Sequence, residues 1–359
     1  MKKDFLKNKI IYEDMNMIYA SNIRGKKLKN ARILVTGAYG MIASYLVYFL
    51  IFLNEVHNFQ IDIWVIVRNE EKLRNRFGEY VDQEYFHFKI QELDKQIEIE
   101  EKMDYIVHAA SLASPQYYNL IPTQVMLPNV IGTYYLLEYA KKCKLKKFLF
   151  FSSSEIYGKQ DDRIQENYDE TVMGILDPMD VRNCYAESKR MGENMCIDYY
   201  KEYGIKTSSV RIFHTFGPTM DVWHDERAFS EFVANVIDRK NIEMKSEGTA
   251  KRPFCYITDA ICAFLLILLD DQSGQVYNLC NEENYVSIYE LAKILVGLFP
   301  ERKLSVKRVS RDSTSAYVAK KDENDITANS GKLKKIGWKP QVTVSSGFKR
   351  TIRAIEEEI

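Results

Sequence analysis

The sequence has 359 residues, enough for one large domain or two closely associated domains with an extensive core. Lysine plus arginine and aspartate plus glutamate each number 50, so no overall charge favours nucleic acid or a membrane, and any anion site must be local. The six cysteines form no CxxC pair and no Cys/His cluster, which favours free thiols in a reducing cytoplasm over disulfides or a metal site. The first residues lack the apolar core of a signal peptide.

Apolar runs and turn residues predict an N-terminal appendage followed by alternating strands and helices. The appendage comprises residues 1–30 and contains a short amphipathic helix at 10–20. Strands are predicted at residues 33–35, 61–67, 85–90, 105–110, 147–151 and 207–213. Helices are predicted between them at residues 44–53, 70–77, 128–143 and 185–203. This alternation predicts an α/β fold with a doubly wound parallel sheet. Beyond residue 214 the pattern loosens, and helices at 229–239 and 288–298 predict a second, smaller domain.

The first strand runs into a turn with three small residues, Gly37, Gly40 and Ala43. The first small residue permits a tight turn, the second lets a pyrophosphate approach the backbone, and the third lets helix and strand pack closely. The free N–H groups of the following helix N-terminus suit phosphates. No charged residue occurs from 33 to 53, a length that also suits a membrane span, but the glycines split this run into strand and helix. The turn therefore predicts a dinucleotide site and no membrane association.

Tyr185 and Lys189 are four residues apart on a predicted helix, so their side chains share one face. A phenol normally ionises near pH ~10, which is too high for a base at neutral pH, and a neighbouring cation lowers that pKa. Such a pair can move a proton on and off a sugar hydroxyl. A chance Tyr-x-x-x-Lys spacing on a helix is the competing interpretation.

The strand at 147–151 ends in the serine-rich segment Ser152-Ser-Ser-Glu155. Ligands bind at the carboxyl ends of strands in open α/β sheets. We therefore expect Ser153 to lie beside Tyr185 and to hydrogen-bond the reacting hydroxyl. The role of Glu155 depends on the reaction, and ordinary turn chemistry explains the serines equally well.

The glycine turn, the serine-rich strand end and the Tyr/Lys pair, in this order, resemble the extended short-chain dehydrogenase/reductase family, which acts on nucleotide sugars. The likeness extends from about residue 31 to the C-terminus and includes segments at 276–281 and 333–340 that resemble the cap region of that family. Within the family, the chain most resembles the UDP-glucuronate decarboxylases (UDP-xylose synthases). Four segments carry this likeness: residues 108–118, 153–155, 211–218 and 251–256.

The resemblance implies a site and a domain organisation. Residues 31–213 and 254–281 would form a Rossmann-type dinucleotide-binding domain, and residues 214–253 and 282–359 a nucleotide-sugar-binding domain. The implied catalytic residues are Tyr185, Lys189, Ser153 and Glu155. The implied cofactor-binding residues are Gly37, Tyr39, Gly40, Met41, Ile42, Arg68, Asn69, Glu92, Leu93, Ala109, Ala110, Ser111, Tyr185, Lys189 and Phe213. The implied substrate-binding residues are Ser114, Tyr117, Ser154, Glu155, His214, Arg227 and Arg252, with no metal.

Several positions depart from the family pattern. Ser153 stands where the decarboxylases usually have threonine, and Ser154 stands where the 4,6-dehydratases carry an acidic aspartate, which argues against dehydration. His214 replaces a usual asparagine, and Thr219 replaces an arginine. Arg68 ends the second strand, where NAD enzymes commonly place an acidic residue, so NAD is expected but NADP is possible.

The sequence favours a nucleotide-sugar enzyme with a bound nicotinamide cofactor, and within that class one that decarboxylates UDP-glucuronate. A 4-epimerase or 4-ketoreductase would need the same tyrosine and lysine, and an NADPH-consuming reductase gains weight if Arg68 binds a 2′-phosphate. A non-catalytic dinucleotide sensor is the alternative from another class. The resemblance also implies a homodimer joined through the helices near 128–143 and 185–203.

Overall fold

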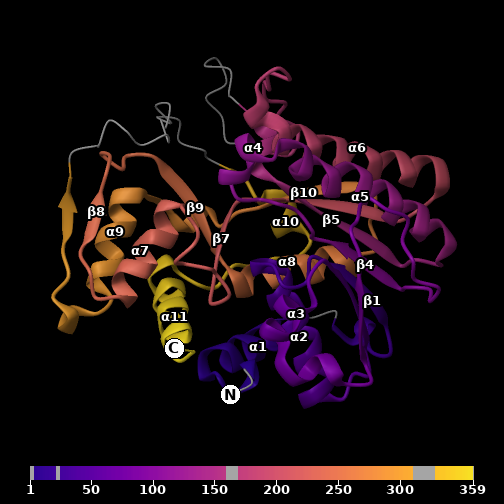
Figure 1. Ribbon diagram of the computed structural model, residues 1–359, viewed down its shortest axis with the longest axis horizontal. Coiled ribbons are helices and arrows are strands. Elements are labelled where there is room, and N and C mark those ends of the chain that lie inside the picture. The colour runs from indigo at the N-terminus through magenta and orange to yellow at the C-terminus, as the bar shows by residue number, and fades with distance from the viewer. Residues whose placement is uncertain (1–3, 22–24, 159–168, 310–327, 359) are drawn as a thin grey trace.

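The computed structural model describes residues 4–21, 25–158, 169–309 and 328–358 (Figure 1). Its central feature is a seven-stranded sheet with the order β10-β6-β5-β4-β1-β2-β3, in which every pairing is parallel. The strands are β1 (Arg32–Thr36), β2 (Asp62–Val67), β3 (Phe86–Ile90), β4 (Tyr105–His108), β5 (Lys147–Ser153), β6 (Thr207–Ile212) and β10 (Gln275–Leu279). The predicted doubly wound α/β sheet is thus confirmed.

Helices cover both faces of this sheet because side chains alternate along each strand and both sets are apolar. Val35 and Leu149 point to the face that packs on α2 (Met41–His57) and α8 (Ile257–Leu269). Leu34 and Phe148 point to the opposite face, which packs on α5 (Pro122–Lys142) and α6 (Cys184–Tyr203). A shorter helix, α3 (Glu70–Phe77), connects β2 and β3.

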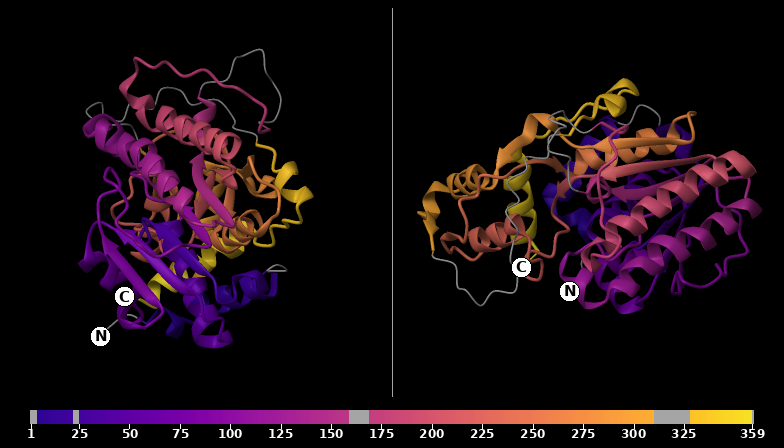
Figure 2. Two further views of the ribbon diagram at one scale, coloured as in Figure 1. Left: turned by 90° about the vertical axis from the view of Figure 1, so that its right-hand side faces the viewer. Right: turned by 90° about the horizontal axis from the view of Figure 1, so that it is seen from above.

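A smaller layer lies beside the sheet, on the left in Figure 1 and again in the right-hand view of Figure 2. It contains a three-stranded sheet, β11-β9-β7, and a two-stranded sheet, β12-β8. Its strands are β7 (His214–Phe216), β8 (Ile242–Met244), β9 (Lys251–Tyr256), β11 (Tyr285–Ser287) and β12 (Val306–Arg308). Its helices are α7 (Ala228–Ile237), α9 (Ile288–Gly297) and α11 (Val344–Glu356). Phe348 of α11 stacks on Phe216 of β7 with ring centroids 3.9 Å apart.

The structure corrects three expectations. The helix predicted at 128–143 begins at Pro122, because proline suits the first helical position, and Pro128 then lies inside the helix. The segment at 276–281 does not belong to the cap region, because β10 forms the edge of the main sheet beside β6. Helices α8 and α11 were not predicted, and α8 is apolar and buried along almost its whole length. No described helix is long and apolar enough to span a membrane. The proposed domain boundaries stay a prediction.

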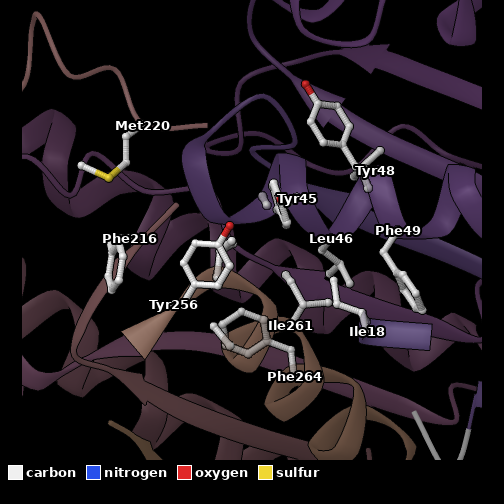
Figure 3. Close-up of a cluster of buried hydrophobic side chains, with 14 of the residues drawn as sticks. Ile18, Tyr45, Leu46, Tyr48, Phe49, Phe216, Met220, Tyr256, Ile261 and Phe264 are labelled. Carbon is white, nitrogen blue, oxygen red and sulfur yellow. The ribbon is translucent and has the colours of Figure 1, made fainter. Parts of the chain in front are cut away.

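The predicted N-terminal helix is confirmed as α1 (Lys9–Ser21), and it packs between α2, α8 and α11. Ile18 of α1 meets Leu46 and Phe49 of α2 and Ile261 of α8 in a shared apolar cluster (Figure 3). The two ends of the chain lie side by side in Figures 1 and 2, and the Asn8 amide donates to the Ala354 carbonyl at 2.9 Å. The N-terminal segment is therefore an integral part of the fold.

Asp14 of α1 is a fully buried carboxylate that joins four elements. It accepts hydrogen bonds from the hydroxyls of Tyr45 on α2 and Tyr256 on β9, each at 2.5 Å. The Arg350 guanidinium of α11 donates to it at 2.7 Å. Burial raises the pKa of Asp14, while Arg350 and the two hydroxyls oppose that rise. The carboxylate is tolerated here because its oxygens are hydrogen-bonded and its charge is paired.

We expect Arg350→Met to destabilise the protein by about 3 kcal/mol, because it leaves a buried carboxylate without its cation. Adding Asp14→Asn to this variant should restore part of the loss, since the amide removes the unpaired charge. Urea denaturation followed by circular dichroism measures both changes. Arg353→Met, an exposed position on the same helix, is the control. Equal losses for Arg350→Met and Arg353→Met would contradict the prediction.

Candidate active site

The glycine turn between β1 and α2 has the close backbone approach that the sequence predicts. Gly37 has a φ of +67°, and a Cβ atom on it would lie 2.6 Å from the Ala110 Cα atom, so only glycine fits. Gly40 is the N-cap of α2 and provides no side-chain hydrogen bond to the first helical turn. The first amides of α2, at Met41 and Ile42, therefore start a helix with no side-chain cap, as a phosphate-binding turn requires.

A buried hydrogen-bond network holds this turn. The predicted site included two of its members, Ala109 and Ala110, but not Thr36 or His108. The Thr36 hydroxyl lies 2.8 Å from His108 Nδ1 and accepts hydrogen bonds from the amides of Ala109 and Ala110. His108 Nε2 lies 3.0 Å from the Pro128 carbonyl of α5. Burial lowers the pKa of His108 to about 3, so the ring is neutral, with Nδ1 accepting from Thr36 and Nε2 donating to Pro128. The network fixes the ends of β1 and β4 against α5.

Tyr185 and Lys189 lie on the buried face of α6, as their spacing predicts. The Lys189 ammonium donates to the Phe151 carbonyl at 2.7 Å and lies 5.7 Å from the centre of the Tyr185 ring. Burial raises the pKa of Tyr185 to about 12, and a hydrogen bond with Ser153 opposes that rise. The expected lowering of the Tyr185 pKa is therefore wrong, because burial outweighs the hydrogen bonds and the nearby Arg227 charge.

The remaining catalytic candidates surround the Tyr185 hydroxyl at the carboxyl end of β5. Ser153 caps the short helix that starts at Ser154 and accepts a hydrogen bond from the Glu155 amide at 3.2 Å. Glu155 is exposed, and its carboxylate is close enough to raise the pKa of Tyr185. Ser111, which follows β4, lies close enough to the phenol to lower that pKa, although its buried Oγ atom makes no hydrogen bond of good geometry among the described residues.

Tyr118 is a site residue that the predicted set omits, although it follows Tyr117 directly. Its ring stacks on the Tyr185 ring at 5.0 Å with an interplanar angle of 10°, and its hydroxyl donates to the Ala113 carbonyl at 3.0 Å. Tyr117 is half-buried beside it, with its amide bonded to the Ser114 carbonyl. The stacking holds the Tyr185 ring in one orientation, and no pattern in the sequence shows it.

The predicted substrate residues His214, Arg227 and Arg252 come together in the smaller layer. Both arginines lie close enough to His214 to lower its pKa, which burial already depresses, to about 3. The His214 Nδ1 atom is buried without a hydrogen-bond partner in the described part of the chain. Arg227 also lowers the pKa of Tyr185, so this arginine adjoins both groups of residues. The arrangement is a cationic site next to the tyrosine.

Arg227 is held by an aspartate that the sequence did not reveal. Its Nε and Nη2 atoms donate to the Asp225 carboxylate at 2.5–3.0 Å, and the Ser230 hydroxyl donates to the same carboxylate at 2.9 Å. This leaves the Nη1 edge of the guanidinium for a second anion. Arg252 donates only to the backbone carbonyl of Lys251 among the described residues.

The other predicted cofactor residues lie at the carboxyl edge of the sheet. Arg68 follows β2, and its Nη1 atom lies 4.0 Å from the carboxylate of Glu92, which follows β3. The Asn69 side chain caps α3 by accepting from the Lys72 amide, so it is already occupied. Leu93 is buried against Gly132 of α5. Tyr39 is partly buried in the core of the main sheet, whereas Phe213 is buried in a separate cluster with Tyr157 and Cys280.

A profile of the NAD dependent epimerase/dehydratase family matches residues 33–280, and the chain belongs to this family. It is therefore an enzyme of a family that uses NAD. UDP-glucuronic acid decarboxylase 6 of Arabidopsis thaliana is 30% identical over 91% of this chain and 90% of that protein. UDP-glucuronic acid decarboxylase 1 of Xenopus tropicalis is 31% identical over 91% of this chain and 73% of its own length.

Solved structures share the fold at lower identity. UDP-glucose 4-epimerase of Thermotoga maritima, solved with UDP-glucose, has a TM-score of 0.74 and 23% identity, with 91% of this chain and 99% of that chain covered. UDP-glucuronic acid 4-epimerase of Bacillus cereus, solved with UDP-glucuronic acid and NAD, has a TM-score of 0.73 and 21% identity, with 91% and 100% covered. The predicted Rossmann-type fold is confirmed.

The site fits the NAD that the family uses. The turn at Gly37 and the uncapped start of α2 would hold the pyrophosphate, and the buried Ser111 hydroxyl lies beside Tyr185. Arg68 follows β2, whose end would receive the adenosine ribose in this fold.

Lys189 gives the protein a pH-dependent stability. Burial lowers the pKa of Lys189 from 10.5 to about 7, so the folded state binds fewer protons than the unfolded state between these two values. Stability must therefore rise with pH through this window, while the cost of the buried ammonium is fully present below pH 7. Lys189→Met should remove this rise. At pH 6 its free energy of unfolding should exceed that of the native protein by a few kcal/mol, since one pKa unit corresponds to about 1.4 kcal/mol.

Urea denaturation at pH 6, 8 and 9.5 measures the effect as a difference between the two proteins. Lys201→Met, an exposed lysine on the same helix, is the matched control and should follow the native profile. A parallel pH dependence for native protein and Lys189→Met would contradict the account of the buried ammonium.

Proposed function

We propose that the protein converts UDP-glucuronate to UDP-xylose and carbon dioxide. The observation that supports this most directly is the 30% identity with UDP-glucuronic acid decarboxylases over 91% of the chain. The same positions that resemble those enzymes hold Ser153, Glu155, Tyr185 and Lys189, which share one edge of the sheet in this structure. A nucleotide sugar is the substrate class that suits a tyrosine base beside a cationic site.

Tyr185 is the proton carrier in this proposal. Its oxygen takes the proton of the sugar C4 hydroxyl, and the Ser153 hydroxyl, its hydrogen-bond partner, orients the same sugar oxygen. The turn at Gly37 and the start of α2 would hold NAD, which when bound would provide reversible hydride transfer at C4 and a positive charge that lowers the pKa of the phenol. Tyr118, stacked on the phenol ring, and Lys189, beneath it, keep the oxygen in position through both proton transfers.

Oxidation at C4 makes the substrate a β-keto acid, because the carboxylate is attached to the neighbouring C5 carbon. The bond from C5 to the carboxylate then breaks, carbon dioxide leaves, and the electron pair passes into an enolate that the C4 ketone stabilises. A proton adds to C5, and we assign its delivery to Glu155, the exposed acid beside Tyr185. Tyr185 finally returns its proton to the C4 oxygen, which gives the pentose.

The cationic cluster of the smaller layer would bind the diphosphate of the substrate. Asp225 orients Arg227 by accepting hydrogen bonds from the Nε and Nη2 atoms of its guanidinium. The Nη1 edge can then donate to an oxyanion. Arg252 and the His214 ring complete the cluster. His214 is neutral there, so it can recognise the sugar or the diphosphate by a hydrogen bond but adds no charge of its own.

A sugar 4-epimerase or 4-ketoreductase is the second candidate, because both reactions begin or end at the same Tyr185 and Ser153. Dehydration at C6 is disfavoured because Ser154 stands where that reaction needs an aspartic acid. The buried tyrosine with its lysine and serine argues against a protein that only senses dinucleotides. The product of UDP-glucuronate decides among these candidates.

We also propose that the protein is a cytoplasmic homodimer. Six free cysteines suit a reducing compartment.

The dimer proposal rests on exposed apolar side chains on the two helices that the resemblance assigns to a dimer interface. They are Met126, Ile131 and Tyr134 of α5 and Met191 of α6. Exposed apolar side chains on adjoining helices are typical of a buried interface. A single-chain mass in light scattering would contradict the dimer.

Purified protein incubated with UDP-glucuronate should release carbon dioxide and form UDP-xylose, while Tyr185→Phe should lose about 10³-fold in turnover because it lacks the proton carrier. UDP should still bind to Tyr185→Phe, since the diphosphate site is intact. Tyr199→Phe is the matched control and should keep its activity, because Tyr199 lies elsewhere on α6 and its hydroxyl donates to Glu138 of α5. UDP-galacturonate as the product would favour a 4-epimerase, and full activity of Tyr185→Phe would contradict the mechanism.

A further inference from the structure

The short helix that carries Glu155 needs support from the rest of the fold. This helix, η4 (Ser154–Tyr157), is a single 3₁₀ turn that follows β5. Such turns have poor hydrogen-bond geometry and little stability of their own. Glu155 is exposed, so the position of its carboxylate depends on how firmly the backbone of η4 is held.

The last residue of η4 is fixed on the main sheet. The Tyr157 hydroxyl accepts a hydrogen bond from the Arg211 guanidinium of β6 at 2.8 Å and donates to the side-chain oxygen of Asn278 on β10 at 2.7 Å. These bonds orient the Tyr157 side chain, but they leave the backbone carbonyls of η4 to other partners.

Arg190 holds one of these carbonyls from α6, the helix that carries Tyr185 and Lys189. It is half-buried and follows Lys189 directly. Its Nε atom donates to the Ile156 carbonyl of η4 at 2.8 Å, and its Nη2 atom donates to the Gly174 carbonyl at 2.6 Å. The guanidinium is planar and rigid, so these two bonds fix both carbonyls relative to one another and to α6.

The second carbonyl belongs to a segment that crosses the end of η4 in very close contact. A Cβ atom on Gly174 would overlap the Tyr157 carbonyl, so only glycine fits at this crossing. From Gly174 the chain runs on into α6, which begins at Cys184, directly before Tyr185. Arg190 therefore joins the segment that carries the acid to the segment that leads into the tyrosine.

We propose that Arg190 is a positioning residue that holds Glu155 at a fixed distance from Tyr185, so that the proton reaches C5 of the sugar from one side. The inference rests on the proposed function, because it takes Glu155 as the acid of that step. The O–H bond of Glu155 breaks, the electron pair of the enolate forms the new C5–H bond, and the carboxylate regains a proton from solvent. Arg190 acts through the two backbone carbonyls.

A purely structural role for Arg190 is the alternative, and the side from which C5 is protonated distinguishes the two. UDP-glucuronate is converted by the full chain in deuterium oxide, and nuclear magnetic resonance locates deuterium in the UDP-xylose. The native protein should place deuterium at only one of the two C5 hydrogen positions. Arg190→Met should form product about ten-fold more slowly and label both positions, because a displaced acid lets water protonate either face.

Arg190→Lys keeps one donor for one of the two carbonyls, so its labelling should lie between those of the native protein and Arg190→Met. This variant also decides the question if Arg190→Met does not fold. In a single turnover, carbon dioxide leaves before C5 is protonated. The delay between carbon dioxide and UDP-xylose should therefore lengthen in both variants.

Lys201→Met, which removes a cation from an exposed position of the same helix, is the matched control and should label one position without added delay. The label does not depend on how much of a variant is folded. Labelling of one position in both Arg190 variants, with no added delay, would overturn the inference even if their turnover fell. Failure of the native protein to form UDP-xylose would instead contradict the proposed function.

Discussion

The arrangement of the site depends on one buried carboxylate. Asp14 brings a charge from the N-terminal helix into the interior, and Tyr45, Tyr256 and Arg350 hold it there. Tyr45 lies one turn into α2, the helix whose start forms the dinucleotide turn, and Tyr256 ends β9, the strand that carries Arg252. A buried charge tolerates little displacement of its partners, because each lost contact leaves it uncompensated. The glycine turn before α2 and strand β9, which carries Arg252, are therefore held at a fixed distance from each other.

Within this frame, burial determines the chemistry of the site more than neighbouring charges do. It raises the pKa of Tyr185 and lowers the pKa values of Lys189 and His108, so burial favours the neutral form of each group. A positive charge brought close to the phenol by a bound ligand would oppose the effect of burial on Tyr185.

The sequence predicted the elements that local patterns control and missed those that depend on tertiary contact. The glycine turn, the Tyr185/Lys189 spacing and the main strands follow from local geometry, and the structure confirms them. Tyr118 and the Thr36–His108 network act through partners distant in sequence, so no spacing reveals them. Asp225 pairs with Arg227 only two residues away, but nothing in that spacing marks it as part of the site. The pKa of Tyr185 was expected in the wrong direction, because burial cannot be read from a four-residue interval.

In the proposed reaction, Tyr185 serves a reversible oxidation at C4 whose hydride stays in the site. UDP-glucuronate carrying deuterium at C4 tests this most directly, with nuclear magnetic resonance of the product in ordinary water. The account predicts UDP-xylose that keeps deuterium at C4, released together with carbon dioxide and with no external cofactor consumed. Product without deuterium at C4, or carbon dioxide release that requires stoichiometric added cofactor, would contradict it.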